Sequence, residues 1–283
     1  MPELQLRGGE VDGLRLNYVV EGRGPAVILV HGLGGFAESW RHNIRPLAGR
    51  ATVYALDLPG FGDSAKPRTR YRLAYFAGAL RSFMDGLGLA QASLVGHSLG
   101  GAVSVTYALT HPSRVERLAL VGAVIPGCGY RPSWIYRLMA LRGIGEALSL
   151  GGCATLYKTA LARCFHAPDR QEIDFFVDHR YAARTDAAAR AAYLATLRDV
   201  RIDFETHAKD YRRALATLEL PVLLIHGRQD HVVHREHCAE VAAVLRHAAV
   251  RWVDACGHFP QIEHVDAVNA WLVDFLVGRP APR

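Results

Sequence analysis

The chain lacks the features that mark membrane, secreted and nucleic-acid-binding proteins. None of its apolar runs approaches the ~20 residues needed to cross a bilayer, so no stable membrane insertion is expected. The amino terminus has no basic segment followed by an apolar stretch, which argues against a signal peptide and makes the cytoplasm the expected location. The arginines are spread along the chain, so the net charge of +6 does not predict a nucleic-acid partner.

Metal and disulfide motifs are missing as well. The sequence has an odd number of cysteines and no Cys-x-x-Cys pair. The cysteines are Cys128, Cys153, Cys164, Cys238 and Cys256. We expect them to be reduced and mostly buried. The spacing of His231, His234 and His237 imitates a metal site, but they lie at the polar start of an expected helix, so neither a metal nor another cofactor is predicted.

What the sequence does contain is an alternation of apolar runs and amphipathic segments. Strands are expected at 26–30, 53–56, 92–95, 118–121, 222–225 and 250–253, after an antiparallel pair at 4–7 and 14–20. Helices are expected at 37–49, 71–87, 235–245 and 263–277. Continuous apolar runs are typical of strands buried on both faces. The predicted fold class is therefore α/β, with a mostly parallel sheet and helices on both faces.

The alternation stops between residues 126 and 214, where helical patterns dominate. Helices are expected at 134–141, 145–161, 169–181, 187–197 and 202–215. We interpret 126–214 as a helical cap, or lid, inserted into a core made of 1–125 and 215–283. Its aromatics fit a hydrophobic roof, and only a minority of them are expected to touch substrate. They are Trp134, Tyr136, Tyr157, Phe165, Phe175 and Phe176.

A candidate nucleophile lies at the centre of the chain. Gly96-His97-Ser98-Leu99-Gly100 follows an apolar strand and precedes a helix of small residues. Gly-x-Ser-x-Gly at such a junction is a nucleophile elbow, a tight turn that lifts the serine hydroxyl above the sheet. The glycines are needed because side chains two residues on either side of the serine would collide. The N–H of Leu99 would then point to where an oxyanion forms.

Three further loops follow strand ends and so should meet Ser98 at one edge of the sheet. His31-Gly32-Leu33-Gly34 offers the N–H of Leu33 as a second oxyanion donor. Asp230 follows the strand at 222–225, and His258 follows the strand at 250–253. Serine, aspartate and histidine thus occur in the order that serine hydrolases of this topology use.

These motifs together resemble the α/β-hydrolase fold family over about residues 26–277. Asp57-Leu-Pro-Gly-Phe-Gly62 and Gly257-His258-Phe-Pro260 add to the match. The resemblance implies that Ser98 is the nucleophile and His258 the general base and then acid. It implies that Asp230 orients the imidazole, and that the N–H groups of Leu33 and Leu99 form the oxyanion hole. Serine at the elbow argues against the dehalogenase and epoxide hydrolase relatives, which carry aspartate there.

We expect a cofactor-independent serine hydrolase acting on carboxylic esters of small to medium apolar acids or alcohols, similar to esterases and lipases. A carbon–carbon bond hydrolase of vinylogous diketones is the nearest alternative. Lactonase or thioesterase chemistry would need the same machinery, and a ligand receptor on the same fold is a rival of another class. The base must be neutral to act, so the rate should fall below about pH 6–7.

Three other polar residues are interpreted as structural. Asp57 should accept hydrogen bonds from its own loop. His97 should point into the scaffold. Glu263 should place a negative charge at the start of the last helix, where it complements the helix dipole.

Overall fold

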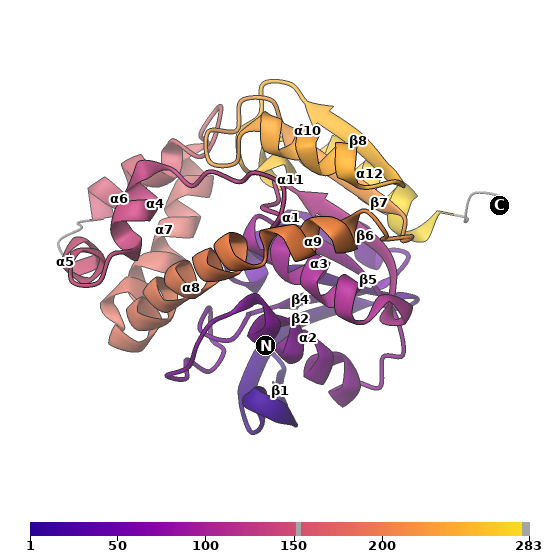
Figure 1. Ribbon diagram of the computed structural model, residues 1–283, viewed down its shortest axis with the longest axis horizontal. Helices are drawn as coiled ribbons and strands as arrows, with labels where there is room; N and C mark the ends of the chain where they lie inside the picture. The colour runs from indigo at the N-terminus through magenta and orange to yellow at the C-terminus, as the bar shows by residue number, and fades with distance from the viewer. Residues whose placement is uncertain (151–153, 279–283) are drawn as a thin grey trace.

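The computed structural model describes residues 1–150 and 154–278 and has an eight-stranded sheet at its centre (Figure 1). The strands are β1 Glu3–Gln5, β2 Arg15–Gly22, β3 Ala26–Val30, β4 Thr52–Leu56, β5 Ala92–His97, β6 Val115–Val121, β7 Val222–Gly227 and β8 Ala248–Val253. Their order across the sheet is β1-β2-β4-β3-β5-β6-β7-β8. β1 and β2 run antiparallel to their neighbours, and all pairs from β4 to β8 are parallel. The predicted fold class is confirmed.

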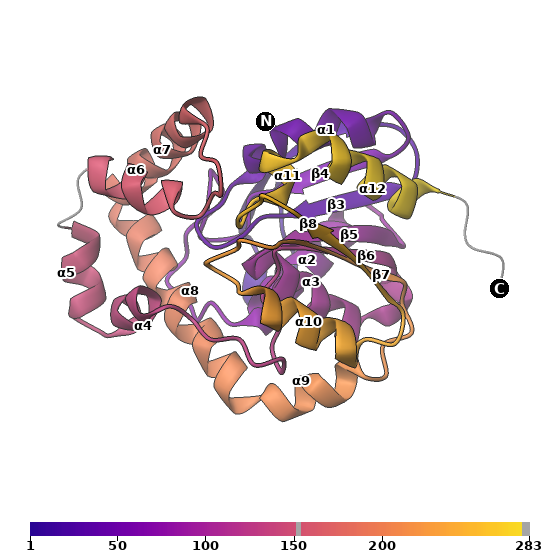
Figure 2. The ribbon, with the colours of Figure 1, turned by 90° about the horizontal axis from the view of Figure 1, so that it is seen from above.

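Helices cover both faces of the sheet (Figure 2). One face packs on α1 (Arg41–Ala48) and α12 (Val265–Val277), and the other packs on α2 (Leu73–Gly86), α3 (Leu99–Thr110) and α10 (Arg235–Val244). The short helices are η1 Gly9–Val11, η2 Ala37–Trp40, η3 Pro112–Arg114 and α11 Pro260–Glu263.

The central strand β3 shows why its sequence is apolar throughout. Val27 and Leu29 belong to the core on the α1 side, whereas Ile28 and Val30 belong to the core on the α2 side. Successive side chains of a strand point to opposite faces, so a strand covered on both faces needs an apolar residue at every position.

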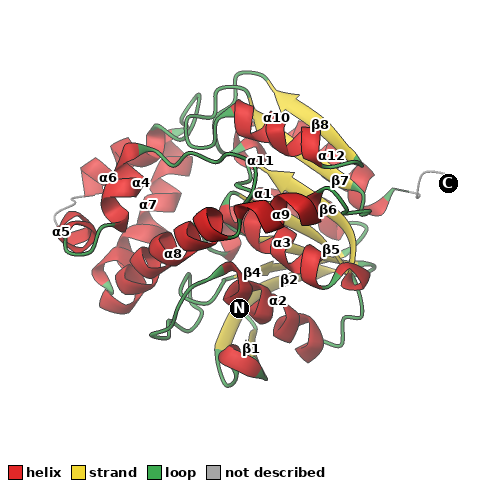
Figure 3. Cartoon of the chain, viewed as in Figure 1, coloured by secondary structure: helices red, strands yellow, loops and turns green. Residues whose placement is uncertain are grey.

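Among the described residues, six helices separate β6 from β7 and form the helical insertion, residues 134–215 (Figure 3). They are α4 Trp134–Ala140, α5 Ile144–Leu150, α6 Ala154–Ala162, α7 Arg170–Thr185, α8 Ala187–Thr206 and α9 Ala208–Leu215. The helix predicted at 145–161 is helical at both ends, as α5 and α6, and its middle, residues 151–153, lies outside the described part. The predicted break between 197 and 202 was wrong. No glycine or proline interrupts that stretch, so α8 continues to Thr206.

The C-terminal half of α8 is attached to the loop before α2. Asp199 accepts a hydrogen bond from the Tyr71 N–H at 2.8 Å. The buried Asp203 accepts from the Arg72 Nε–H and from the Leu73 N–H, each at 2.8 Å. These bonds fix this half of the helix to the core.

The cysteines and the membrane expectation can be compared with the described residues. Cys128, Cys238 and Cys256 are buried and Cys164 is half-buried, all four as free thiols, while Cys153 lies outside the described part. Across residues 1–150 and 154–278, none of the helices has both the length and the apolar character that a bilayer crossing requires.

His237 of α10 forms hydrogen bonds with the backbone of the segment that leads from β6 into the insertion. Its Nδ1–H donates to the Cys128 carbonyl at 2.6 Å, and its Nε2 accepts from the Ile125 N–H at 3.0 Å. Burial lowers the pKa of His237 to about 4. The neutral ring is therefore part of the folded structure, and both of its nitrogens are engaged by the backbone.

This pKa shift predicts a loss of stability in acid. In the unfolded chain the histidine takes up its proton near pH 6.5, but in the folded chain it does so only near pH 4. The free energy of unfolding should therefore fall as the pH drops from about 6.5 to about 4, by about 3 kcal/mol from this residue. Urea denaturation at pH 7 and pH 4.5 measures the loss. A His237→Gln variant keeps a donor and an acceptor without titrating, so it should lose about 2 kcal/mol less; an equal loss in both proteins contradicts the assignment.

Candidate active site

Ser98 occupies the turn between β5 and α3 with an unusual backbone. Its φ is 52° and its ψ is −120°, a region that costs a non-glycine residue about 1–3 kcal/mol. The turn is held by the Ser98 N–H, which donates to the Val121 carbonyl at 3.1 Å, and by the Ser98 carbonyl, which accepts from Gly101 and Val124 at 2.9 and 3.1 Å. The surrounding hydrogen bonds thus impose the conformation that raises the side chain from the sheet edge.

The flanking glycines are required because the backbone approaches them closely. A Cβ at Gly96 would lie 2.4 Å from the carbonyl oxygen of Gly100, and one at Gly100 would lie 2.1 Å from that of Val30. Gly32 is as tight, because its Cβ would lie 2.9 Å from the Cβ of Ser98. The predicted steric reason for Gly-x-Ser-x-Gly is confirmed at both positions.

His258 and Asp230 form a buried pair beyond the ends of β8 and β7. The His258 Nδ1 lies 2.8 Å from the Asp230 Oδ2. The other carboxylate oxygen, Oδ1, accepts from the N–H groups of Val232 and Val233 at 2.8 and 2.9 Å. Burial alone would raise the pKa of Asp230, but the charge and hydrogen bond of His258, with smaller contributions from His226 and the Val233 N–H, hold this pKa below its usual value. The carboxylate therefore stays ionised beside the imidazole.

Gly122 was not singled out from the sequence, yet it makes room for this pair. It follows β6 with a φ of +50°, and a Cβ there would lie 3.0 Å from the His258 carbonyl oxygen and 3.4 Å from the His258 Nδ1. The only feature of the sequence that could have pointed to Gly122 is its place directly after the apolar run 118–121. A side chain at this position would crowd the backbone of His258 and would also have to adopt a disfavoured φ.

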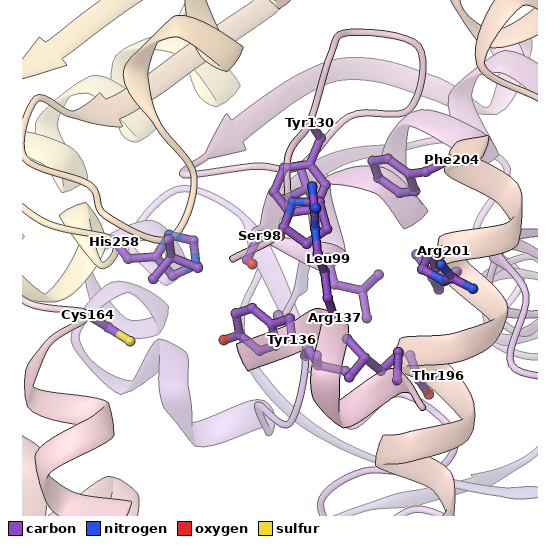
Figure 4. Close-up of a pocket in the computed structure, with 18 of the residues that line it drawn as sticks. Ser98, Leu99, Tyr130, Tyr136, Arg137, Cys164, Thr196, Arg201, Phe204 and His258 are labelled. Carbon is purple, nitrogen blue, oxygen red and sulfur yellow. The ribbon is translucent and has the colours of Figure 1, made fainter. Parts of the chain in front are cut away.

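Ser98, His258, Leu33 and Leu99 line one cavity of about 810 Å³. Figure 4 shows Ser98, Leu99 and His258 around it. Leu99 is the first residue of α3, so its N–H belongs to the helix N-terminus, where N–H groups have no intrahelical acceptor. Asp230 lies behind His258, outside the cavity. The structure thus brings together all five residues predicted from the sequence.

The cavity lies between the sheet edge and the helical insertion. Its lining is mainly apolar, with residues of the insertion such as Leu138, Leu161, Phe176, Val200 and Phe204. Of the six aromatics predicted to form a roof, Trp134, Tyr136 and Phe176 line it, and the others do not. Half of the predicted roof aromatics therefore line the cavity, and the expectation that only a minority touch substrate stays a prediction.

Comparison with known proteins places this chain in a family. A family model for the alpha/beta hydrolase fold matches residues 25–265. The chain belongs to the α/β-hydrolase fold family.

Three similar proteins represent the relatives. The chain is 32% identical to the dihydrolipoyllysine-residue acetyltransferase component of the acetoin cleaving system of Cupriavidus necator, over 95% of this chain and 68% of that protein. It is 30% identical to the 2-hydroxy-6-oxo-6-(2'-aminophenyl)hexa-2,4-dienoic acid hydrolase of Metapseudomonas resinovorans, over 92% of this chain and 87% of that protein. Among solved structures, 2-hydroxy-6-oxo-6-phenylhexa-2,4-dienoate hydrolase of Rhodococcus sp. strain RHA1 is similar, with a TM-score of 0.82, 27% identity and coverage of 97% and 98% of the two chains.

Two residues of this α/β hydrolase that were predicted to be structural do support loops of the site. The buried Asp57 accepts from the Ala37 N–H, the Asn17 Nδ2–H and the Asp63 N–H at 2.6, 2.7 and 2.8 Å. His97 has its Nε2 2.8 Å from the carbonyl oxygen of His258. Its ring lies 4.8 Å from the His258 ring and also lines the cavity, so the prediction that it points into the scaffold is only partly correct.

The predicted role of Glu263 was wrong. The residue ends the four-residue helix α11 and precedes α12 by one residue, and its carboxylate does not cap α12. It turns back to accept hydrogen bonds from the loop that carries His258. The sequence shows an acidic residue close to the start of a helix. It does not show that the loop carrying His258 folds back to place its N–H groups at this carboxylate.

The predicted absence of a metal remains a prediction about the whole chain. In the described residues, no group of three or more histidine, cysteine and acidic side chains is arranged to hold a metal ion. His237, one of the three clustered histidines, is committed to the backbone on both ring nitrogens.

Proposed function

We propose that this α/β hydrolase cleaves its substrate through an acyl-enzyme on Ser98. His258 serves as base and Asp230 holds the imidazole in the required tautomer. The observation that carries the proposal is the 2.8 Å contact between His258 and Asp230 beside a cavity that Ser98 also lines. The cap is the segment 126–214 predicted from the sequence, and the helices of the insertion, residues 134–215, make up most of it.

The chemistry follows from the proton positions. When the Nδ1–H of His258 donates to Asp230, the Nε2 lone pair is left to take the proton of the Ser98 hydroxyl, which then attacks a carbonyl carbon. The oxyanion is stabilised by the N–H groups of Leu33 and Leu99, at roughly 3 kcal/mol per donor. The imidazolium then gives its proton to the leaving group, and water hydrolyses the acyl-enzyme by the same steps in reverse.

The substrate we propose is a vinylogous diketone acid, whose carbon–carbon bond is cleaved. Two of the relatives named above are hydrolases of such dienoic acids, one by sequence and one by structure. This ordering reverses the preference drawn from the sequence, where esters came first. The same residues suit both reactions, because each includes serine attack on a carbonyl. In the dienoic acid the 2-hydroxy-dienol must first become its 2-oxo tautomer, so that the carbon leaving group departs as a conjugated dienolate, which then takes the proton of the imidazolium. An ester instead loses an alkoxide and needs no such first step.

Arg137 favours the acidic substrate. It lines the cavity from α4, together with Arg201 and Glu205 of α8. Arg201 pairs with Glu205 at 3.2 Å, whereas within the described residues no carboxylate is paired with Arg137. An unpaired guanidinium in a largely apolar cavity is suited to a substrate carboxylate. A neutral ester would leave this charge unused.

A substrate panel with an arginine variant tests the assignment. We expect wild-type protein to cleave a coloured 2-hydroxy-6-oxo-dienoate with a higher kcat/KM than p-nitrophenyl butyrate. In Arg137→Met, loss of one charge-assisted hydrogen bond should raise the KM for the dienoate about 10- to 100-fold and change the ester kinetics little. Arg142→Met, outside the cavity lining, is the matched control. Faster ester turnover with no effect of Arg137→Met would instead establish the esterase.

A further inference from the structure

The carboxylate of Glu263 joins two separate segments of backbone. Its Oε1 accepts from the Gly257 N–H at 2.9 Å and, more weakly, from the Phe259 N–H at 3.4 Å. Its Oε2 accepts from the N–H of His166 at 2.7 Å. The first two donors flank His258, whereas His166 lies in the loop between α6 and α7 of the helical insertion. One side chain therefore holds both the histidine loop and the insertion.

Other contacts hold the histidine loop close to residues 164–166 of the insertion. The His258 N–H donates to the carbonyl of Cys164 at 2.7 Å, and the rings of Phe165 and Phe259 stack with centroids 4.7 Å apart. A Cβ at Gly257 would lie 2.5 Å from the Cys164 carbonyl oxygen, so the two backbones are in direct contact. The segment 164–166 of the insertion thus forms one wall of the histidine loop.

We propose that Glu263 is a positioning residue for His258, and that it acts by fastening the histidine loop to residues 164–166 of the helical insertion. The proposal rests on the role given above to His258. Glu263 does not contact the cavity; it acts through the backbone on both sides of the imidazole. The geometry of the base is therefore set partly by the insertion and not by the core alone.

Position 263 requires a carboxylate because the Gly257 N–H and the His166 N–H each need an acceptor oxygen. Glutamine offers one oxygen, so its amide N–H₂ must face either the Gly257 N–H or the His166 N–H. One donor is then left without a partner, and the loop shifts or loosens. Ala255 lies in this loop, after the end of β8, and has a φ of 49°. The loop thus already contains one disfavoured backbone conformation that its contacts must maintain.

A second tie between insertion and core provides a matched control. Glu172 of α7 pairs with Arg41, and its Oε1 lies 2.8 Å from the Nε2 of His42, at the start of α1. This glutamate also links the insertion to the core, but it touches nothing in the histidine loop. Glu172→Gln should therefore loosen the insertion without moving His258.

The test uses the rate at which a fluorophosphonate phosphonylates Ser98, because this rate depends on the serine and histidine and not on the substrate class. Glu263→Gln should label at least about ten-fold more slowly than wild type, and Glu263→Ala more slowly again, since misplacing a catalytic group by 1 Å can cost about 10²-fold. Glu172→Gln should label at the wild-type rate. The ¹H resonance of the proton between His258 and Asp230 should broaden in the Glu263 variants only. Thermal unfolding of each variant corrects the rates for any unfolded fraction.

The outcomes separate this inference from the proposed function. If the wild-type protein is not labelled at Ser98, the proposed nucleophile fails. If the wild-type protein is labelled and Glu263→Gln is labelled as fast, only the positioning role fails. Equal slowing in Glu263→Gln and Glu172→Gln would mean that the insertion as a whole matters, and it would overturn the specific role of Glu263.

Discussion

Replacing Ser98 with alanine should lower kcat about 10⁶-fold while leaving the fold intact. The hydroxyl is the attacking atom of the proposed reaction, and without it only binding and the oxyanion donors remain. The methyl group of alanine fits the same turn, because the hydrogen bonds that hold residue 98 come from its backbone. Turnover of the dienoate and the ester, with the intact mass after fluorophosphonate treatment, measures the loss.

Ser39 provides the control for that experiment. It lines the same cavity, and its hydroxyl donates to the carbonyl of Phe36 at 2.5 Å. Ser39→Ala should keep both turnover and labelling. Residual turnover of Ser98→Ala above about 1% of wild type, or an adduct on Ser39, would show that another group is the nucleophile.

Asp230→Asn should reduce kcat about 10⁴-fold, by the same reasoning that applies to other serine–histidine–aspartate sites. The Asn Oδ1 can still accept from the N–H groups of Val232 and Val233, so the amide N–H₂ is directed at His258. The imidazole must then accept at Nδ1 and carry its proton on Nε2, where it cannot take the proton of Ser98. The variant is therefore nearly inactive because its imidazole is in the wrong tautomer, while the position of the His258 ring should change little.

Asp254→Asn is the matched control, because this exposed aspartate follows β8 and pairs with Arg228 at 2.7 Å outside the site. It should retain the wild-type kcat. Asp230→Asn with a kcat within ten-fold of wild type would show that the carboxylate does not set the tautomer. The lowered pKa of Asp230 adds a further check, since the native carboxylate should stay ionised below the usual range for aspartate.

The strand ends and the candidate triad could be predicted because their signals are local. An apolar run followed by Gly-x-Ser-x-Gly specifies a buried strand, a tight turn and a helix within a dozen residues. Asp230 and His258 lie close together because parallel strands end at the same edge of the sheet, and β7 and β8 are neighbours. The proximity of Asp230 and His258 could therefore be predicted from the sheet topology alone, without knowledge of any side-chain contact.

The supporting residues could not be predicted because their partners are distant in sequence. Glu263 binds the backbone of His166, 97 positions earlier, and His237 binds Ile125, 112 positions earlier. Nothing in the neighbourhood of either residue indicates its partner. The start of α7 could be predicted because the Asp169 side chain caps it at Gln171 and Glu172. The extension of α8 to Thr206 was missed because a weak amphipathic pattern hid its continuity.

The attachment of α8 has a consequence for how new substrate ranges arise by mutation. Asp199 and Asp203 fix the C-terminal half of α8 to the core, so these hydrogen bonds also hold the cavity residues on that half, such as Val200 and Phe204. The cavity residues of α4, including Leu138, lie on a helix that has no fully buried side chain and whose Trp134 is 74% accessible. Substitutions in α4 disturb little packing. We therefore expect changes in substrate range to arise first from substitutions in α4, while the cavity residues of α8 change more slowly.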